Sequence, residues 1–598
     1  MPQKVLAGRA ADPLLRGDVV HVKVDQVILT KAPARPMAEA LTWGMKKCPV
    51  EVAVAYDGAC VSDNAICAAR QSGDHTTVPP EALLHGILIA KPGVGFPGPL
   101  HLERFASPAR LAVTDDPRLA FVGGIGMLAL VLPPSQLAHA LAAGTVTVRP
   151  PRSVQILLSG RVRPFVCARD VALELIRCGL ADKVRELDMK YGAPVVLEFA
   201  GPSARLMSVP DRAVLCAIAP AVGAASALFV SDEKSETFLR DQRRSKAHRA
   251  LAPDAGAPCD DVISIDLATV DPLLMDTKGE VKPVRDLAGM PVRQVVLGGD
   301  SGVTLRDMLA AAALLKSKRV PSRLEFLVAP PSRQVLEVLA NTGSLVDLVA
   351  TGARLVEPDH RLITGETYPS LGTSVRSFDP EPQPDRDNAF IVASAETLAY
   401  TVANGQLGDP RSFKRPVRVT VPRVFPTEDV LIVRPRKSNL ANVGKKLEVK
   451  PASTSGFQGA SQLDILTSAP AAPLGDGKQA AVIAGNLDDV RRVASVALDN
   501  IGALRVVVAS HIPSGTAAML GGMGIGAFRA TDGDLAVLRG ASKLDIPPPS
   551  AWNVDGIVEA TADGGKVSLT WLGLKAERGG LETGVSRPTQ PNIKPLPR

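Results

Sequence analysis

Continuous apolar runs rich in β-branched residues alternate with alanine- and leucine-rich stretches along most of this chain. Residues 293–299 (RQVVLGG) and 324–330 (LEFLVAP) are two such runs, and helical stretches follow them at 304–316 (TLRDMLAAAALLK) and 333–341 (RQVLEVLAN). Runs without polar–apolar alternation are typical of strands buried on both faces of a parallel sheet. Their repeated alternation with helices predicts an α/β fold.

The length of the chain excludes a single hydrophobic core. Cores stop growing near about 250–300 residues, so a chain of 598 residues is expected to form three or four domains. Seams rich in Pro and Asp at 250–260 and 379–387, and a Lys-, Ser- and Gly-rich stretch at 436–480, are expected to be loops or linkers. Residues 576–598 offer no apolar face and are expected to be disordered.

Composition narrows the expected partners and compartment. The 68 basic and 61 acidic residues give a net charge of +7, and the densest basic segment, 240–249, is expected to be a solvated loop, so nucleic-acid binding is not favoured. No apolar run approaches the roughly 20 residues that span a bilayer, and the first residues lack the apolar core of a signal peptide. All seven cysteines lie in the first half and are expected to be reduced thiols. The chain is therefore predicted to be cytoplasmic, without a membrane partner.

Six stretches carry motifs in a fixed order: 6–30, 167–183, 195–229, 298–335, 389–410 and 499–529. Together they resemble the aconitase/3-isopropylmalate dehydratase superfamily over nearly the whole chain. The resemblance implies three α/β/α domains around a cleft and a C-terminal swivelling β/α domain. It divides the chain into domains 1 and 2 (1–290), domain 3 (291–412), the start of the swivelling domain with a linker (413–480), the rest of that domain (481–575) and the tail (576–598).

The family holds a 4Fe–4S cluster with three cysteines, and the matching positions here hold other residues. The family's G-S-C-T-N motif resembles residues 298–302 (GGDSG), which places Asp300 at the cysteine position. Its P-x-C-x-x-C-x-G motif resembles 358–365 (PDHRLITG), which places His360 and Ile363 at the other two. Such clusters require thiolate ligands, and no cysteine follows Cys259. We therefore expect neither the cluster nor another cofactor.

The family's acid–base and substrate-binding motifs are also only partly kept. Asp57 and Asp115 match two acidic positions, but the histidines and serine beside them are replaced. Arg376 and Arg491 match arginines that bind substrate carboxylates in the family, whereas Glu381 stands where a further arginine is expected. A guanidinium makes bidentate contacts with a carboxylate, so the resemblance assigns Arg376 and Arg491 to substrate binding. A structural ion pair is an equally open role for either arginine.

Two glycine-rich segments have alternative interpretations. Gly298 and Gly299 end a predicted strand before a helix, where backbone N–H groups could hold an anion, although a structural turn is favoured. Residues 521–526 (GGMGIG) do not fit a nucleotide-binding loop. In the resemblance they form the turn of the swivelling domain that faces the cleft.

The coordinated replacement of cluster ligands, histidines and serines leads to our main functional hypothesis. We expect a cluster-free member of the superfamily without the family's hydratase activity, retained to bind a small carboxylate or a protein partner. The alternative is a hydro-lyase acting on a hydroxy-carboxylic acid such as citrate or isopropylmalate, with a metal at Asp300 and His360 as the Lewis acid. A third class is a structural role, as a homo-oligomer or beside an active relative.

Overall fold

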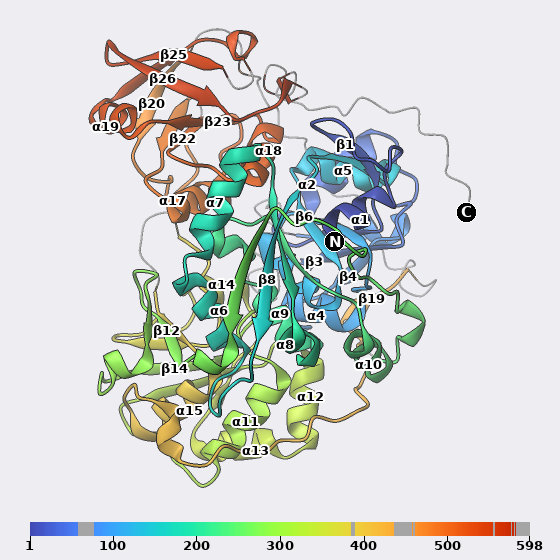
Figure 1. Ribbon diagram of the computed structural model, residues 1–598, viewed down its shortest axis with the longest axis vertical. Helices are drawn as coiled ribbons and strands as arrows, with labels where there is room; N and C mark the ends of the chain where they lie inside the picture. Colours follow the sequence, from blue (N-terminus) through green and yellow to red (C-terminus); the bar gives the residue numbers. More distant parts are fainter. Residues whose placement is uncertain are drawn as a thin grey trace.

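A computed structural model of the chain (Figure 1) shows, in the described residues, three open sheets of four to seven strands, a two-stranded sheet and a closed barrel. The residues that it describes are 1–57, 77–383, 389–427, 429–435, 457, 461–475, 477–553, 556–575, 577–578 and 581. No helix among them is long and apolar enough to cross a membrane. Most of the expected linker at 436–480 and most of the expected disordered tail lie outside the described residues.

The first sheet has six strands in the order β19-β4-β3-β2-β5-β6. All neighbours are parallel except β19, which runs antiparallel to β4. The strands are β2 Gln26–Leu29, β3 Val52–Tyr56, β4 Leu88–Ala90, β5 Leu111–Thr114, β6 Leu128–Val131 and β19 Ile432–Val433. The helices of this part of the chain are α1 Pro2–Ala7, α2 Ala34–Thr42, α4 Pro97–Arg104 and α5 Pro134–Ala143, and a separate antiparallel pair is formed by β1 Val20–Lys23 and β7 Thr145–Val148.

The second sheet has four parallel strands in the order β10-β9-β8-β11. Its strands are β8 Arg152–Ser159, β9 Val195–Ala200, β10 Ser226–Phe229 and β11 Asp261–Asp266. Its helices are α6 Ala168–Arg177, α7 Leu180–Tyr191, α8 Pro202–Leu206, α9 Val209–Cys216 and α10 Glu233–Asp241. The densest basic segment therefore begins within α10 and is not entirely a loop.

The third sheet has seven strands in the order β13-β12-β18-β17-β14-β15-β16. Its strands are β12 Leu273–Met275, β13 Val281–Pro283, β14 Gln294–Gly298, β15 Glu325–Ala329, β16 Arg354–Leu355, β17 Ser374–Arg376 and β18 Ile391–Ala393. Its helices are α11 Leu305–Leu315, α12 Arg333–Asn341, α13 Ser344–Thr351, α14 His360–Thr364 and α15 Ala395–Asn404. Thr304 caps α11 in a capping box with Asp307, which is why this helix begins directly after the glycine-rich turn.

Residues 457–581, here called the barrel unit, close on themselves because β20 pairs with both β21 and β24. The strands are β20 Ser461–Leu466, β21 Ala480–Ile483, β22 Leu504–Ala509, β23 Gly526–Ala530, β24 Lys543–Ile546, β25 Ile557–Ala562 and β26 Gly565–Trp571. The helices are α17 Leu487–Val496, α18 Ser514–Gly522 and α19 Asp532–Gly540. Trp552 and Trp571 pack in the barrel core with ring centroids 5.8 Å apart.

Short 3-10 helices connect these elements. They are η2 Pro80–His85, η3 Pro117–Ile125, η4 Ala219–Val222, η5 Ser245–Ala247, η6 Leu267–Thr269, η7 Val284–Leu287, η8 Pro410–Phe413 and η9 Pro549–Ala551.

The predicted α/β class is confirmed, because parallel strands alternate with helices in each of the three larger open sheets. Two details differ from the expected domain boundaries. Strands β12 and β13 precede residue 291 and yet belong to the third sheet, and β19 falls within 413–480 and yet pairs with the first sheet. All three strands pair in antiparallel fashion toward the end of a sheet, and their membership is decided by long-range pairing and not by local pattern.

Three buried carboxyl groups interact where α6, α11 and α15 begin. Asp170 Oδ1 accepts a hydrogen bond from Leu273 N (2.9 Å), and Asp307 Oδ2 accepts one from Thr304 N (2.9 Å). Glu396 Oε2 is buried and has no hydrogen-bond partner among the described residues. Burial, with added repulsion from the neighbouring acids, raises the pKa of Glu396 to about 7 and that of Asp307 to about 8.

These raised pKa values predict how stability depends on pH. The folded state binds protons that the unfolded state has released, so the free energy of unfolding should fall as pH rises from about 4.5 to about 8. E396Q is expected to remove part of this fall and to stabilise the protein by about 1–2 kcal/mol at pH 8.5, but hardly at pH 4.5. Urea unfolding at both pH values measures this, with E337Q, at an exposed position on α12, as the control. Equal effects of E396Q at the two pH values would contradict the prediction.

Candidate functional site

A cleft of about 520 Å³ lies between the barrel unit and the first two sheets. Residues of β6, α5 and β7 form one wall, and residues of α17 and α18 form the opposite wall. In Figure 1 the barrel unit, in orange and red, lies at the top beside α7. The cleft is therefore assembled from parts of the chain that are hundreds of residues apart.

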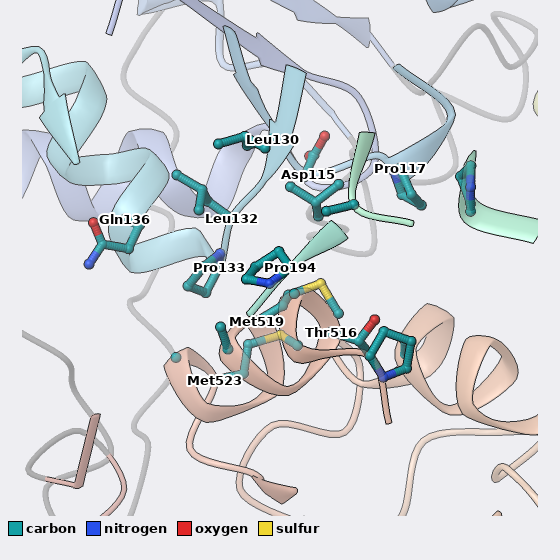
Figure 2. Close-up of a pocket in the computed structure, with 18 of the residues that line it drawn as sticks. Asp115, Pro117, Leu130, Leu132, Pro133, Gln136, Pro194, Thr516, Met519 and Met523 are labelled. Carbon is teal, nitrogen blue, oxygen red and sulfur yellow. The ribbon is translucent and has the colours of Figure 1, made fainter. Parts of the chain in front are cut away.

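The lining is apolar on both walls. Leu132 and Pro133 lie opposite Met519 and Met523 of α18, with Pro194 between them (Figure 2). Methionine side chains are unbranched and adapt to ligands of varied shape. Charged residues also line the cleft, among them Arg491 on α17 and Lys31, Asp115, Arg118, Asp379 and Glu381.

Two polar contacts join the barrel unit to the rest of the chain at the cleft, and a glycine allows the two parts to approach closely. Asp188 of α7 accepts hydrogen bonds from the backbone N–H (2.9 Å) and the hydroxyl (2.8 Å) of Ser514. Arg149 Nη2 donates to both carboxylate oxygens of Glu577 at 2.9 and 3.0 Å. A Cβ on Gly522 would lie 2.3 Å from Pro133 Cγ, so glycine permits the close approach of α18.

Asp300, at one cysteine position of the resemblance, is bound to an arginine. Arg118 Nη2 donates to Asp300 Oδ1 at 2.6 Å and to the backbone oxygen of Asp379 at 3.0 Å. The Asp300 side chain is only 7% exposed. Burial opposes the charge of Arg118, but the Asp300 carboxylate outweighs it and raises the pKa of the guanidinium.

His360, at the second cysteine position, contacts Glu381. His360 Nε2 lies 3.1 Å from Glu381 Oε2, and Lys31 Nζ donates to Glu381 Oε1. Burial alone would raise the pKa of Glu381, but Lys31 and His360 hold it well below its usual range. Burial opposes protonation of His360, yet Glu381 raises its pKa. Ile363, at the third position, is 2% exposed and packs in an apolar cluster.

A third pair lies beside these two. Arg169 Nη1 donates to Asp379 Oδ2 at 2.7 Å, and the hydroxyl of Ser301 lies 3.5 Å from the same oxygen. Burial would raise the pKa of Asp379, but Arg169 and Arg118 lower it below the ordinary value. The two aspartates and the glutamate of this region, Asp300, Asp379 and Glu381, are thus each bound to a basic side chain.

The two remnant acids lie in different surroundings. Asp115 lines the cleft and accepts backbone hydrogen bonds from Thr30, Lys31 and Ala32 at 2.8–3.1 Å. Burial raises its pKa. Asp57 is 4% exposed, accepts a hydrogen bond from Val78 N (2.9 Å) and is not among the residues that line the cleft.

The two arginines assigned to substrate binding do not face one cleft. Arg376 is 1% exposed, donates to the backbone oxygens of Leu362 (2.7 Å) and Tyr368 (3.1 Å), and stacks 4.5 Å from the Phe390 ring centroid. Arg376 is therefore held inside the third sheet and is not among the residues that line the cleft, which favours the structural role that the sequence left open. Arg491 lines the cleft, and its one hydrogen bond among the described residues is to Asp488 Oδ1 (2.8 Å).

The glycine-rich turn after β14 has a structural cause. Gly298 has φ +131°, and a Cβ there would lie 1.8 Å from the backbone oxygen of Ala329. Gly299 has φ +82°, and its Cβ would lie 2.2 Å from the Phe378 ring. Both residues must be glycine because a side chain at either position would collide with Ala329 or Phe378. This supports the interpretation as a structural turn over that as an anion site.

The donor set at the three ligand positions does not fit a 4Fe–4S cluster. A carboxylate, an imidazole and an aliphatic side chain replace the thiolates that such clusters require, and both polar groups are bound to other side chains. Within the described parts of the chain, no group of three or more His, Cys, Asp or Glu side chains is arranged to hold a metal ion.

Comparisons with known proteins agree with this architecture. Residues 76–280 match the model of the Aconitase family (aconitate hydratase). The chain is 27% identical over 422 residues to 3-isopropylmalate dehydratase large subunit 2 of Archaeoglobus fulgidus, covering 69% of this chain and 98% of that protein. It is 29% identical over 316 residues to a probable 3-isopropylmalate dehydratase large subunit of Methanothermobacter thermautotrophicus, covering 51% and 73%. The chain is thus similar over most of its length to 3-isopropylmalate dehydratase large subunits, and part of it matches the Aconitase family model.

Among solved structures, Thermococcus kodakaraensis aconitase X in its holo form aligns with a TM-score of 0.34 at 11% identity, over 69% of this chain and 92% of that one. The fold assignment rests on the sheets described above and not on this likeness.

Sequence reasoning missed several residues of the site. Lys31, Arg118, Arg169, Met519 and Met523 were not singled out as site residues, although the sequence carries one signal for Arg118. Arg118 places a basic residue in the motif that also holds Asp115, and Asp300 places an acidic residue at a cysteine position of the family. Reciprocal changes of charge at two family motifs indicate contact.

Proposed function

We propose that this protein is a cluster-free member of the superfamily that binds a small carboxylate in the cleft and does not catalyse the family's hydration. One observation carries the proposal. Two of the three cysteine positions hold ionisable side chains, Asp300 bound to Arg118 and His360 in contact with Glu381, and the third holds a buried isoleucine. Such pairs are costly to break, so the cluster's ligands are replaced by a stable arrangement.

Among the described residues that line the cleft, the family's acid–base set is not kept. Asp115 remains at the cleft, but its oxygens accept backbone hydrogen bonds and the neighbouring motif positions hold Pro117 and Arg118. Arg491 supplies a guanidinium that can bind a carboxylate. Binding without proton transfer is what these groups support best.

Metal and acid-labile sulphide content test this function. The protein is expressed anaerobically with iron and sulphide supplied, purified, and analysed for both elements and for hydration of aconitate and isopropylmaleate. We expect less than about 0.1 equivalent of iron or sulphide per chain and no turnover. Stoichiometric iron and sulphide would overturn the proposal, and a stoichiometric single metal would favour the alternative hydro-lyase at Asp300 and His360.

A further inference from the structure

Most of the basic side chains that line the cleft are already bound to acidic side chains, so few of them can bind a ligand. Among the described residues, four lysine or arginine side chains (Lys31, Arg118, Arg149 and Arg491), one histidine (His21) and five acidic side chains (Asp115, Asp379, Glu381, Asp499 and Glu577) line it. Three of the four basic side chains are bound to Glu381, Asp300 and Glu577. A ligand with two or three carboxylates would bring further negative charge to a lining without a surplus of cations.

Arg491 differs from the other three basic residues. Its partner Asp488 has a side chain that is 47% exposed, and that pair is an i,i+3 contact on α17. Solvated pairs of this kind contribute little, so Arg491 can exchange its partner at low cost. A guanidinium has five N–H donors in a planar fork, and one hydrogen bond to a described residue occupies only one of them. The cleft therefore offers one strong position for one carboxylate.

The rest of the lining is suited to an apolar body. Leu130, Leu132 and Pro133 on one wall lie opposite Met519 and Met523 on the other (Figure 2). The cleft volume of about 520 Å³ is in the range of pockets that enclose small organic ligands. Each methylene group buried there would strengthen binding about fourfold.

We infer that the ligand of this cleft is an amphipathic monocarboxylate, with its carboxylate on Arg491 and an extended apolar body between α18 and the β6–α5 wall. The inference rests on the proposed carboxylate binding and narrows the class of ligand. It excludes small di- and tricarboxylates as the preferred ligands of the cleft.

Calorimetric titration of the full chain with a series of straight-chain acids tests the inference. Butanoate, hexanoate, octanoate and decanoate are titrated at one pH, beside octan-1-ol, octylamine, succinate and citrate. We expect affinity to rise about three- to fourfold per methylene until the cleft is filled. Octan-1-ol, octylamine, succinate and citrate should each bind at least tenfold more weakly than octanoate.

Substitutions in the cleft test which residues contact the carboxylate of the ligand and which contact its apolar body. R491M should weaken octanoate at least tenfold and leave octan-1-ol unchanged, whereas R491K should retain an intermediate affinity. M519Q should weaken decanoate more than hexanoate, because it lies along the apolar body. R492M, on the same helix but outside the cleft lining, is the matched control and should bind octanoate as the unaltered protein does. Circular dichroism confirms that each variant is folded.

The outcomes separate this inference from the proposed function. If succinate or citrate binds more tightly than octanoate, the amphipathic ligand is wrong while carboxylate binding stands. If octylamine binds most tightly, the cleft recognises a cation and the inference is overturned. If no carboxylate binds, the carboxylate-binding part of the proposed function fails together with the inference, and a protein partner becomes the alternative.

Discussion

R118M is expected to lower the free energy of unfolding by about 3–5 kcal/mol, because it leaves the Asp300 carboxylate buried without its partner. Asp300 is 7% exposed, and Arg118 is the basic side chain bound to it. The same substitution removes the hydrogen bond from Arg118 to the backbone of Asp379. Urea unfolding followed by circular dichroism measures the loss.

Two controls make this prediction specific. R118M/D300L removes both charges and should recover most of the lost stability, since an apolar replacement of a whole buried pair is often neutral. R185M breaks the Arg185–Asp182 pair, whose side chains are 53% and 66% exposed, and should change stability by less than about 0.5 kcal/mol. A loss below about 1 kcal/mol in R118M would mean that the pair does not stabilise the former cluster region.

G298A is expected to cost about 4 kcal/mol or more, or to abolish soluble expression. The added Cβ would lie 1.8 Å from the backbone oxygen of Ala329, so β14 and β15 would have to separate. The φ of +131° adds backbone strain that only glycine avoids. Thermal and urea unfolding of the purified variant measure the effect.

G343A serves as a control that separates the cost of backbone strain at positive φ from the cost of a clash between the added Cβ and its neighbours. Gly343 has φ +76° and open space around its Cβ position, so alanine there should cost only about 1–2 kcal/mol. Equal losses in the two variants would contradict the packing explanation. If the turn were instead an anion site, G298A would remain folded and lose the stabilisation that inorganic phosphate gives to the unaltered protein.

Local sequence patterns predicted the elements around the site well. The expected helix at 333–341 is α12, Arg333–Asn341, and the expected strand at 293–299 contains β14, Gln294–Gly298. These elements depend on neighbours a few residues away, such as the Ser332 hydroxyl that accepts a hydrogen bond from Val335 N. Apolar runs and capping residues are sufficient to specify such elements.

The ion pairs of the site could not be predicted from local sequence patterns. Arg118 and Asp300 are separated by 182 positions, and Lys31 and Glu381 by 350, so no local pattern joins them. The role of Arg376 was left open for the same reason. Its motif position allowed either substrate binding or a structural role, and in the structure the backbone oxygens of Leu362 and Tyr368 bind its guanidinium inside the third sheet. A motif position specifies where the backbone passes and not which group the side chain meets.

The closed barrel has a further consequence for the interface that forms the cleft. A barrel without open sheet edges needs no neighbouring strand to complete it. Among the described residues, the polar contacts that hold the barrel unit at the cleft include Asp188 with Ser514 and Arg149 with Glu577. Because both parts belong to one chain, their association is intramolecular, at a high effective concentration. A contact too weak to join two separate proteins at cellular concentrations can therefore keep this cleft assembled, and its residues remain free to vary with the ligand.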